Sequence, residues 1–290
     1  LPLSIGAQAC IENARQGNWV DAECIGFERD TTYLMAFDQM AGLSPGAVVY
    51  PLLTPQRRAQ GYQMRQGIAS VPIGPQLLGR VVDGLGRPLD GLGGASWSDA
   101  LMRFASPNPL KRKPIHEPLD TGVRAINAML SVGRGQRMGL FAGSGVGKSV
   151  LLSMLTRNCV ADVIVIALVG ERSREVREFC DDQLDDASRS RAVVVASPAD
   201  TSPLSRAKGA EYATDVATWF RDQGKHVVLI VDSLTRYAMA QREIGLSLGE
   251  APVARGYPAS VFGKLPALVE RVGNGEHPEG SLTAFYTVLL

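Results

Sequence analysis

A glycine-rich stretch between an apolar run and a helix-like segment constrains this chain more than any other feature. Residues 139–152 read GLFAGSGVGKSVLL, with Gly143, Gly145 and Gly147 at alternate positions before Lys148. Glycines in such a turn leave the peptide N–H groups bare, and the following helix adds unpaired first-turn N–H groups and its positive dipole end. The stretch therefore predicts a strand, a turn that cradles phosphates, and a helix.

The residues at the start of that helix favour a nucleoside triphosphate with Mg²⁺. Lys148 can reach the β- and γ-phosphate oxygens as a point charge, and the Ser149 hydroxyl can ligate Mg²⁺. The pattern G-x-x-x-x-G-K-[ST] begins here with Ala142 in place of glycine. A plain glycine-rich turn is the alternative, but it does not explain a Lys-Ser pair at the mouth of a helix. We predict that ATP phosphates are bound by Ala142, Gly143, Ser144, Gly145, Val146, Gly147, Lys148 and Ser149.

The bulk composition is that of a soluble globular protein. Of the 290 residues, 45% are hydrophobic and 20% are charged, and the formal net charge is +1. This near-neutral charge argues against a protein whose main affinity is for nucleic-acid backbones. The 4 cysteines are scattered without metal-ligand spacing, which is typical of reduced cytosolic thiols. No membrane-spanning apolar run and no signal peptide are visible, so we expect a cytoplasmic protein.

Both ends of the chain predict a fragment of a longer protein. The sequence begins at Leu1 without a methionine, and it stops at Leu290 within an apolar run that reads as an unfinished strand.

The N-terminal part has the pattern of a small all-β unit. Residues 1–70 contain short alternating strands at 7–11, 19–27, 32–37 and 47–50, separated by turn residues. We predict a partial β-barrel domain over 1–70, a connecting strand and linker over 71–108, and a nucleotide-binding domain over 109–290 that is truncated at its C-terminal end.

After residue 109, apolar strands alternate with helices, which is typical of an α/β domain with a parallel sheet. Helices are predicted from Ser149 to about Asn158 and from Ser202-Pro203 to about Gln223. Ligands of such sheets bind at the carboxyl ends of the strands. The predicted strands are 137–141, 163–169, 192–196, 226–231 and 282–289.

Two carboxylates follow strands that are predicted to end near the phosphate loop. Asp232 ends the run VVLIVD and can hold Mg²⁺ through its water shell, together with Ser149; capping of the next helix is the alternative. Glu171 follows the strand that ends at Val169, so it can polarise a water for in-line attack on the γ-phosphorus. The alternative is that Glu171 and Glu175 only favour the start of a helix.

Arg172 is the third member of the predicted catalytic set, with Lys148 and Glu171. It could brace the Glu171 carboxylate or contact the γ-phosphate. The charges that follow over 174–178 alternate in sign at helical spacing, so we interpret them as a solvated helix face.

Several segments of the chain, taken together, resemble the hexameric ATPases of flagellar and type III secretion export. These ATPases are similar in turn to the catalytic subunit of the rotary ATP synthase. The flagellar type is the more similar through Asn127 and the run AMAQ at 238–241. The segments are AGSGVGKS at 142–149, VGERSRE at 169–175, VDSLTRYA at 231–238, and further matches at 120–127, 133–141, 239–244 and 255–262.

The resemblance implies an α/β fold in which a small partial N-terminal β-barrel precedes a RecA-like P-loop NTPase core with a parallel sheet. It implies ATP hydrolysis that powers protein export through the flagellar type III secretion apparatus, with ATP and Mg²⁺ as cofactors. In that family Lys148 and Ser149 would bind phosphates and Mg²⁺, and Glu171 would activate the water. Asp232 would support the metal.

The resemblance also implies partners. We expect a homohexamer at the cytoplasmic face of the bacterial inner membrane, in contact with the export apparatus, stator and stalk proteins, chaperones and export substrates, and no nucleic acid. An arginine finger, an adenine-stacking aromatic residue and a C-terminal helical domain are expected beyond Leu290. The departures from the family pattern are Ser173, where glycine or threonine is frequent, and Ala259, where proline is usual.

Three other functions stay open at this point. A catalytic subunit of an ion-translocating rotary ATP synthase would differ only in its partners. A ring-shaped RNA helicase would show hydrolysis that RNA stimulates and salt suppresses. A nucleotide-binding subunit that does not hydrolyse ATP would be expected to lack the carboxylate that Glu171 provides.

Overall fold

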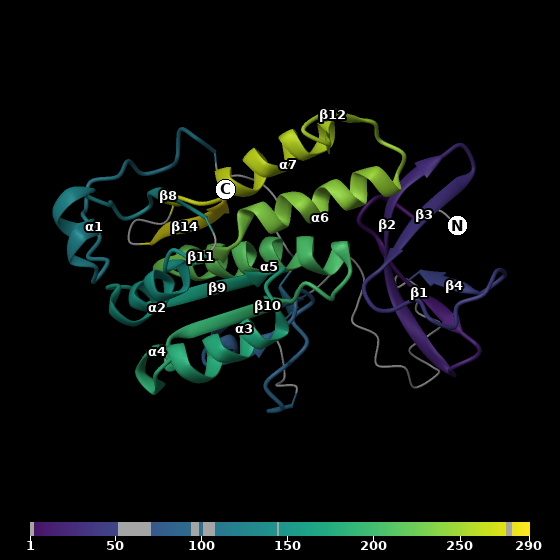
Figure 1. Cartoon of the computed structure of the whole chain (residues 1–290), viewed down its shortest axis with the longest axis horizontal. Helices are drawn as coiled ribbons and strands as arrows, with labels where there is room; N and C mark the ends of the chain where they lie inside the picture. The colour runs from purple at the N-terminus through teal and green to yellow at the C-terminus, as the bar shows by residue number, and fades with distance from the viewer. Residues whose placement is uncertain (1–2, 52–70, 94–98, 101–107, 144, 277–279) are drawn as a thin grey trace.

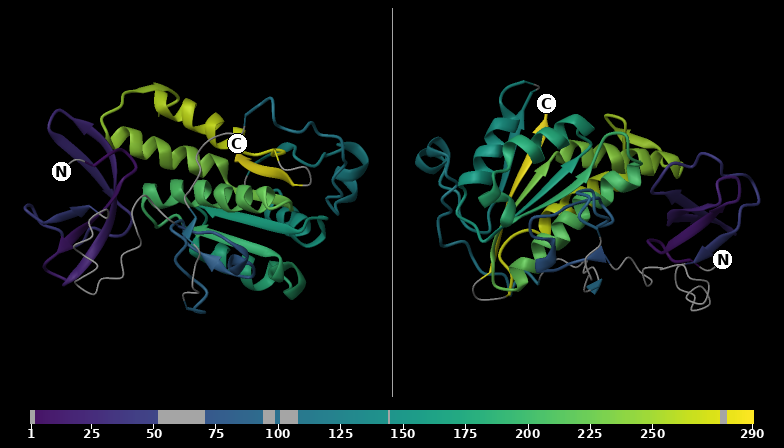
Figure 2. Two further views of the ribbon diagram at one scale, coloured as in Figure 1. Left: turned by 180° about the vertical axis from the view of Figure 1, so that it is seen from behind. Right: turned by 90° about the horizontal axis from the view of Figure 1, so that it is seen from below.

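The computed structural model describes residues 3–51, 71–93, 99–100, 108–143, 145–276 and 280–290. A small sheet of N-terminal strands lies at one end of the molecule, and a larger unit of strands and helices forms the rest (Figures 1 and 2). Among the described residues, no helix is long and apolar enough to cross a membrane.

The N-terminal unit is a four-stranded antiparallel sheet of order β3-β2-β1-β4. Ala9 and Cys24 lie in its small apolar core together with Leu3 and Ala7. Trp19 of β2 and Tyr50 of β4 are partly buried and pack edge-on, with 5.3 Å between their ring centroids. The strands are β1 Gln8–Asn13, β2 Asn18–Glu28, β3 Thr31–Ala36 and β4 Val49–Pro51.

The larger unit is built on a six-stranded sheet of order β6-β10-β9-β11-β14-β8, in which every neighbouring pair is parallel. All five predicted strands of this unit are present to within about one residue at each end. The runs of β9, β10 and β11 are apolar and buried almost throughout, as expected of strands covered on both faces, whereas β8 at the edge of the sheet has only intermediate and exposed residues. The strands are β6 Val81–Val82, β8 Arg137–Ala142, β9 Val163–Val169, β10 Ala192–Ser197, β11 His226–Asp232 and β14 Ser281–Leu289.

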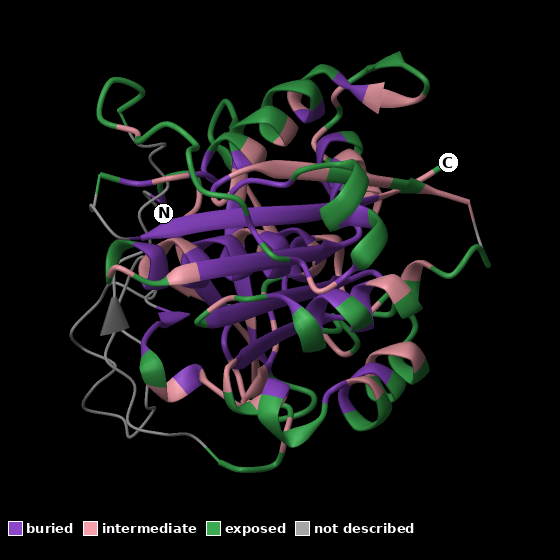
Figure 3. Ribbon diagram, turned by 90° about the vertical axis from the view of Figure 1, so that its left-hand side faces the viewer, coloured by how far each residue is buried: buried purple, intermediate pink, exposed green. Residues whose placement is uncertain are grey.

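Helices cover both faces of this sheet, and its central strands β9, β10 and β11 are buried (Figure 3). The two predicted helices are α2 and α5, and Ser202 caps α5 by accepting a hydrogen bond from the Ser205 N–H, as its sequence indicates. The α-helices are α1 Arg124–Met129, α2 Lys148–Asn158, α3 Ser173–Glu178, α4 Asp186–Ser190, α5 Pro203–Asp222, α6 Leu234–Ser247 and α7 Ala259–Glu270, and two shorter turns are η2 Pro75–Leu77 and η3 Phe179–Gln183.

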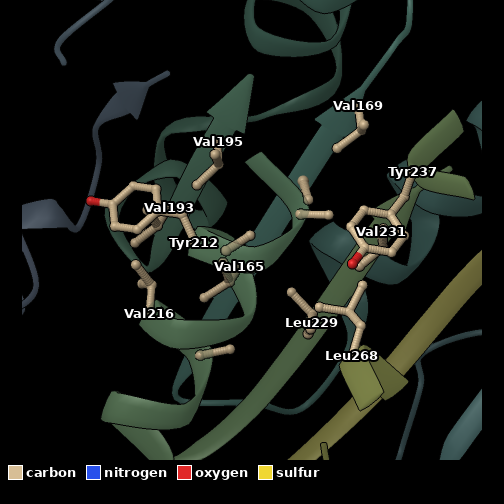
Figure 4. Packing of buried hydrophobic residues seen from close by; sticks show 14 of the residues in the cluster. Val165, Val169, Val193, Val195, Tyr212, Val216, Leu229, Val231, Tyr237 and Leu268 are labelled. Atoms are coloured by element: carbon tan, nitrogen blue, oxygen red, sulfur yellow. The ribbon is translucent and has the colours of Figure 1, made fainter. Parts of the chain in front are cut away.

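The two faces of the sheet have separate cores. One core lies under α5, α6 and α7, where Figure 4 shows Tyr212 among Val193, Val195 and Val216, and Tyr237 beside Val231. The other core lies under α2 and contains Leu152, Leu155, Ile166, Ile230 and Phe285. Because side chains alternate along a strand, Asp232 and Thr287 lie on the second face, the face that α2 covers.

The segment between the two units contributes to the large sheet. Val81 and Val82 of β6 pair with β10 and form one edge of that sheet. Arg80 is anchored to Asp90 by hydrogen bonds of 2.6 and 2.9 Å. Two short strands of this segment, β5 Val71–Pro72 and β7 Asp99–Ala100, pair with each other. Elsewhere in the chain, β12 Pro252–Ala254 and β13 Tyr257–Pro258 form a hairpin. The domain boundaries predicted at residues 70 and 108 adjoin residues 52–70 and 101–107, which lie outside the described residues, and they stay predictions.

Polar contacts join the small unit to the large one at the start of α5. The Ser205 hydroxyl donates to the Phe37 carbonyl at 2.9 Å, and Lys208 pairs with Glu23 of β2 at 3.0 Å. Arg87 also pairs with Asp38 at 2.9 Å. These contacts fix the small sheet beyond the carboxyl end of β10, next to the edge where ligands of parallel sheets bind.

Candidate functional site

The glycine loop joins β8 to α2 and has open space along its backbone. Gly145 and Gly147 have φ angles of +77° and +92°, a region that favours glycine. A Cβ atom placed on Gly143, Gly145 or Gly147 would meet no heavy atom within 4 Å. Ala142 ends β8, and Ser144 lies outside the described residues. The described part of the loop is therefore open at its three glycine positions, where a backbone cradle for a ligand can form.

The first turn of α2 opens onto this cradle. The N–H groups in the first turn of a helix have no acceptor within the helix. Gly147 occupies the N-cap position of α2 and has no side chain that could accept from them, so they can donate to a ligand. The Val146 and Ser149 side chains are exposed. Bare N–H donors, the positive dipole end and an accessible hydroxyl together suit an anion such as a polyphosphate.

Lys148 lies between the two predicted carboxylates. Its Nζ atom is 2.6 Å from Asp232 Oδ1 and 3.4 Å from Glu171 Oε1. Burial alone lowers the pKa of Lys148, but the hydrogen bond and charge of Asp232 and the charge of Glu171 outweigh it, so the pKa is raised overall. Three residues that are far apart in the sequence are thus brought together at the carboxyl ends of β8, β9 and β11, as the sequence predicted.

Glu171 is a half-buried carboxylate with a shifted pKa. Burial first, then the negative charge of Asp232 and a hydrogen bond that the protonated Glu171 carboxyl donates to Glu175, raise the pKa of Glu171 to about 6, against the opposing charge of Lys148. A carboxylate whose pKa is this close to neutrality is a better proton acceptor than an ordinary glutamate, and it suits general-base chemistry.

Asp232 is the last residue of β11 and is 5% exposed. It accepts hydrogen bonds at Oδ1 from Lys148 and, at 2.7 Å, from the Thr287 hydroxyl. The next helix, α6, is capped by Ser233, whose side chain accepts from the Arg236 N–H. Asp232 therefore does not cap α6, and its carboxylate is available to the site.

Arg172 does not join the cluster that the sequence predicted for it. Its side chain is 79% exposed and pairs with Glu175 at 3.6 Å, one turn along α3, and it forms no described ion pair with Glu171. The physical reason is that Arg172 is the N-cap residue of α3, where the chain turns outward from the sheet. The charges that follow pair along the helix surface, Arg174 with Glu178 at 3.1 Å, as predicted for a solvated face.

The structure adds two residues that the sequence interpretation overlooked. Thr287 contacts Asp232 from the neighbouring strand, and the only signal for it was a hydroxyl residue within an apolar strand. Arg236 lies against Gly170, where a Cβ atom would come within 2.9 Å of Arg236 Cβ. Its Nε atom is buried and has no hydrogen-bond partner within the part of the chain that the structure describes.

The donor set of this site fits a nucleotide phosphate chain with a hard cation. The open backbone cradle, the helix N-terminus and Lys148 are phosphate-binding groups. The Ser149 hydroxyl and the Asp232 carboxylate offer oxygen ligands, which Mg²⁺ prefers.

Comparisons with known proteins agree with this geometry. The nucleotide-binding domain of the ATP synthase alpha/beta family matches residues 122–290, more than half of the chain. The β-barrel domain of the same family matches residues 4–52, which identifies the four-stranded sheet as part of that barrel and confirms the predicted fold class.

Individual relatives are similar over nearly the whole chain. A flagellum-specific ATP synthase of Salmonella typhimurium is 56% identical over 292 residues, which cover 100% of this chain and 63% of that protein. A type 3 secretion system ATPase of Xanthomonas euvesicatoria is 46% identical and covers 99% of this chain and 62% of that protein. The chain therefore spans less than two thirds of the length of these curated relatives.

Among solved structures, the assembled ATPase EscN of the enteropathogenic E. coli type III secretion system is 42% identical and has a TM-score of 0.87, over 100% of this chain and 66% of that chain. A second structure of EscN, in complex with its central stalk EscO, has a TM-score of 0.85. The barrel, the parallel sheet and the glycine loop lead to one conclusion: this chain belongs to the ATP synthase alpha/beta family.

Proposed function

We propose that this chain binds Mg²⁺-ATP at the loop of residues 142–149 and hydrolyses it. The observation that carries the proposal is the meeting of Lys148, Glu171 and Asp232 beside a glycine loop whose backbone faces open space. A phosphate-binding lysine, a carboxylate with a pKa near 6 and a metal-supporting aspartate are the parts that phosphoryl transfer to water requires.

Lys148 changes partner when nucleotide binds. In the structure it neutralises Asp232 and Glu171, and in the complex it donates to the β- and γ-phosphate oxygens. The Ser149 hydroxyl and the Asp232 carboxylate would hold Mg²⁺. When bound, Mg²⁺ neutralises charge on the phosphates.

Glu171 accepts a proton from the attacking water and orients that water in line with the bond that breaks. No residue of the chain becomes covalently bound, because positioning and charge stabilisation account for catalysis of this kind. Arg172 is left out of this set, since its side chain is exposed and paired with Glu175.

For the whole protein, we propose that hydrolysis powers protein export through a flagellar type III secretion apparatus. Flagellum-specific ATP synthases of several bacteria are among its relatives, and the EscN relative is described as assembled and bound to a central stalk. We accordingly propose a homohexamer with a stalk partner, located in the cytoplasm at the periphery of the inner membrane. Export chaperones and export substrates complete the proposed partners.

The alternatives from the sequence are less well supported. The relatives named above serve flagella or type III secretion, and this favours export over an ion-translocating rotary synthase. The near-neutral net charge of +1 does not favour an RNA helicase, since nucleic-acid affinity depends on an excess of positive charge. The carboxylate of Glu171 at the site favours a hydrolysing subunit over a silent one.

A chimera tests the proposal. Residues 1–290 would replace the matching segment of the Salmonella relative, which is 56% identical, in cells that lack the native gene. We expect Mg²⁺-dependent phosphate release from ATP by the purified chimera, and recovery of motility in the cells. A chimera that hydrolyses ATP without restoring export would refute the export function only, whereas one that binds no nucleotide would refute both parts.

A further inference from the structure

The buried hydroxyl of Thr287 contacts the Asp232 carboxylate from the neighbouring strand β14. Strand β14 lies between β11, which ends at Asp232, and β8, which leads into the loop. Thr287 of β14 is 0% exposed and is paired in register with Leu140 of β8. It therefore lies on the sheet face that α2 covers, between the metal-supporting strand and the phosphate-binding strand.

The hydrogen-bond geometry assigns the single proton of this hydroxyl. Thr287 Oγ1 is 2.7 Å from Asp232 Oδ1 and 3.4 Å from the Val231 carbonyl oxygen. A hydroxyl has one proton to donate, and the shorter bond to the charged acceptor is the stronger. Burial of a hydroxyl in an apolar strand is costly without such a bond, and valine has the same shape without that cost. The hydroxyl is thus explained by its contact with Asp232.

Both hydrogen bonds to Asp232 described above use Oδ1. Lys148 donates to it at 2.6 Å and Thr287 at 2.7 Å. In the proposed function Lys148 leaves this oxygen for the phosphates, and Thr287 then remains as its donor. A fixed donor on Oδ1 sets the rotation of the carboxylate and leaves Oδ2 for the water shell of the metal.

We infer that Thr287 is a positioning residue for the magnesium site, which holds the Asp232 carboxylate in place once Lys148 has turned to the nucleotide. The inference rests on the proposed function. It adds a residue whose effect passes through Asp232, so its loss should weaken the Mg²⁺-dependent part of nucleotide binding and spare the part that the loop provides alone.

The test compares the affinity of the chimera for a non-hydrolysable ATP analogue in Mg²⁺ and in EDTA, by calorimetry. We expect Thr287→Val to weaken binding in Mg²⁺ by roughly 10- to 100-fold, the usual effect of losing an outer-shell partner, and to leave binding in EDTA unchanged. Thr287→Ser keeps the hydroxyl and should restore the Mg²⁺ effect.

Thr283 provides a matched control on the same strand and face. It is also buried, at 1% exposure, but its hydroxyl accepts from the Gly135 N–H at the opposite end of the strand. Thr283→Val removes an equivalent buried hydroxyl and should leave the ratio of the two affinities as in the unsubstituted protein. In an Asp232→Asn background, Thr287→Val should cause no additional loss, because the two residues act as one unit.

Equal Mg²⁺ dependence in Thr287→Val and the unsubstituted chimera would overturn the inference, and so would an equal loss in Thr283→Val. If Thr287→Val does not fold, Thr287→Ala against Thr287→Ser decides the same question. An unsubstituted chimera without affinity in either buffer would reject the proposed function itself, which is a distinct result.

Discussion

Two lysines of this chain each lie between two carboxylates, yet only one of them belongs to the candidate site. Lys148 contacts Asp232 at 2.6 Å and Glu171 at 3.4 Å, and Lys208 contacts Glu23 at 3.0 Å and Glu211 at 3.6 Å. Their side chains are 15% and 16% exposed. In both cases burial opposes the positive charge, and the flanking carboxylates still raise the pKa of the lysine.

The difference lies in the backbone around each lysine. Lys148 is in the first turn of α2, beside glycines whose missing side chains leave open space. Lys208 is in α5 and pairs with Glu23 in strand β2 of the barrel, so this ion pair joins the two units, while Glu211 is a neighbour one turn along the same helix. Charge, burial and pKa direction alone therefore do not mark a binding site, and an open backbone next to the charges does.

The largest expected effect is on ATP turnover. It tests whether the Lys148 cluster, unlike the Lys208 cluster, has a catalytic role, which we assign to Glu171. Glu171→Gln should lower the turnover of the chimera by about 10²- to 10⁴-fold, because a general base is lost. Nucleotide affinity should stay the same, since the proposed phosphate-binding groups, the glycine loop and Lys148, are unchanged. Phosphate release and calorimetry measure the two quantities, and turnover near that of the unsubstituted chimera would remove Glu171 from its role.

Substitution in the cluster of Lys208, Glu23 and Glu211 should lower the unfolding free energy of the protein. Lys208→Met leaves the buried Glu23 and the partly buried Glu211 without their cation, which costs about 3–5 kcal/mol of unfolding free energy. Lys148→Met is the matched variant and should cost less, because water can enter the open loop and solvate Asp232 and Glu171. Urea unfolding of both variants measures this, and an equal loss would mean that the two clusters do not differ as described.

For nucleotide affinity the order of the two lysines should be reversed, with the larger loss on substitution of Lys148. Lys148→Ala removes a charged donor to the phosphates, worth about 1.5–3 kcal/mol, and affinity should fall roughly 10- to 100-fold. Lys208→Ala should leave the affinity of the folded protein unchanged. Calorimetric titration with ATP at a temperature where both variants are folded provides the measurement; weaker binding by Lys208→Ala would contradict a purely structural role.

The smallest expected effect is the contribution of Glu23 to the pH dependence of the unfolding free energy. Burial raises the pKa of Glu23 above its usual value of 4.5, against the opposing charge of Lys208, so the folded state holds this proton more tightly than the unfolded state. The unfolding free energy therefore falls as pH rises above about 4.5, with a slope from this group of at most about 1.4 kcal/mol per pH unit.

Glu23→Gln should flatten that slope in urea titrations at several pH values. Glu171, whose pKa is raised to about 6, contributes with the same sign in both proteins and cancels in the difference. A steeper slope in the Glu23→Gln variant would show that the pKa of Glu23 is lowered in the folded state.

The sequence predicted best the features that depend on local pattern. The glycine loop, α2, and the strands that end at Val169 and Asp232 are short-range signals, and parallel strands bring their carboxyl ends to one edge. The position of Arg172 was less predictable, because the direction of the chain after Glu171 depends on how α3 packs.

Contacts between segments that are distant in the sequence could not be predicted from local sequence patterns. Thr287 meets Asp232 only because β14 lies between β11 and β8, and no periodicity reveals the order of strands. In the same way, the link from Glu23 to Lys208 joins a barrel strand to a helix 185 positions later (208 minus 23), and each residue alone reads as an ordinary surface charge.

The pairing of Lys148 with its two carboxylates has a kinetic consequence. Asp232 and Glu171 hold Lys148 in place, so in the proposed function an arriving triphosphate exchanges one set of partners of this lysine for another. The exchange weakens capture of the nucleotide, since an existing ion pair must be broken. By the same proposal it would hasten departure of the spent nucleotide, because the carboxylates regain the ammonium group as the phosphates leave.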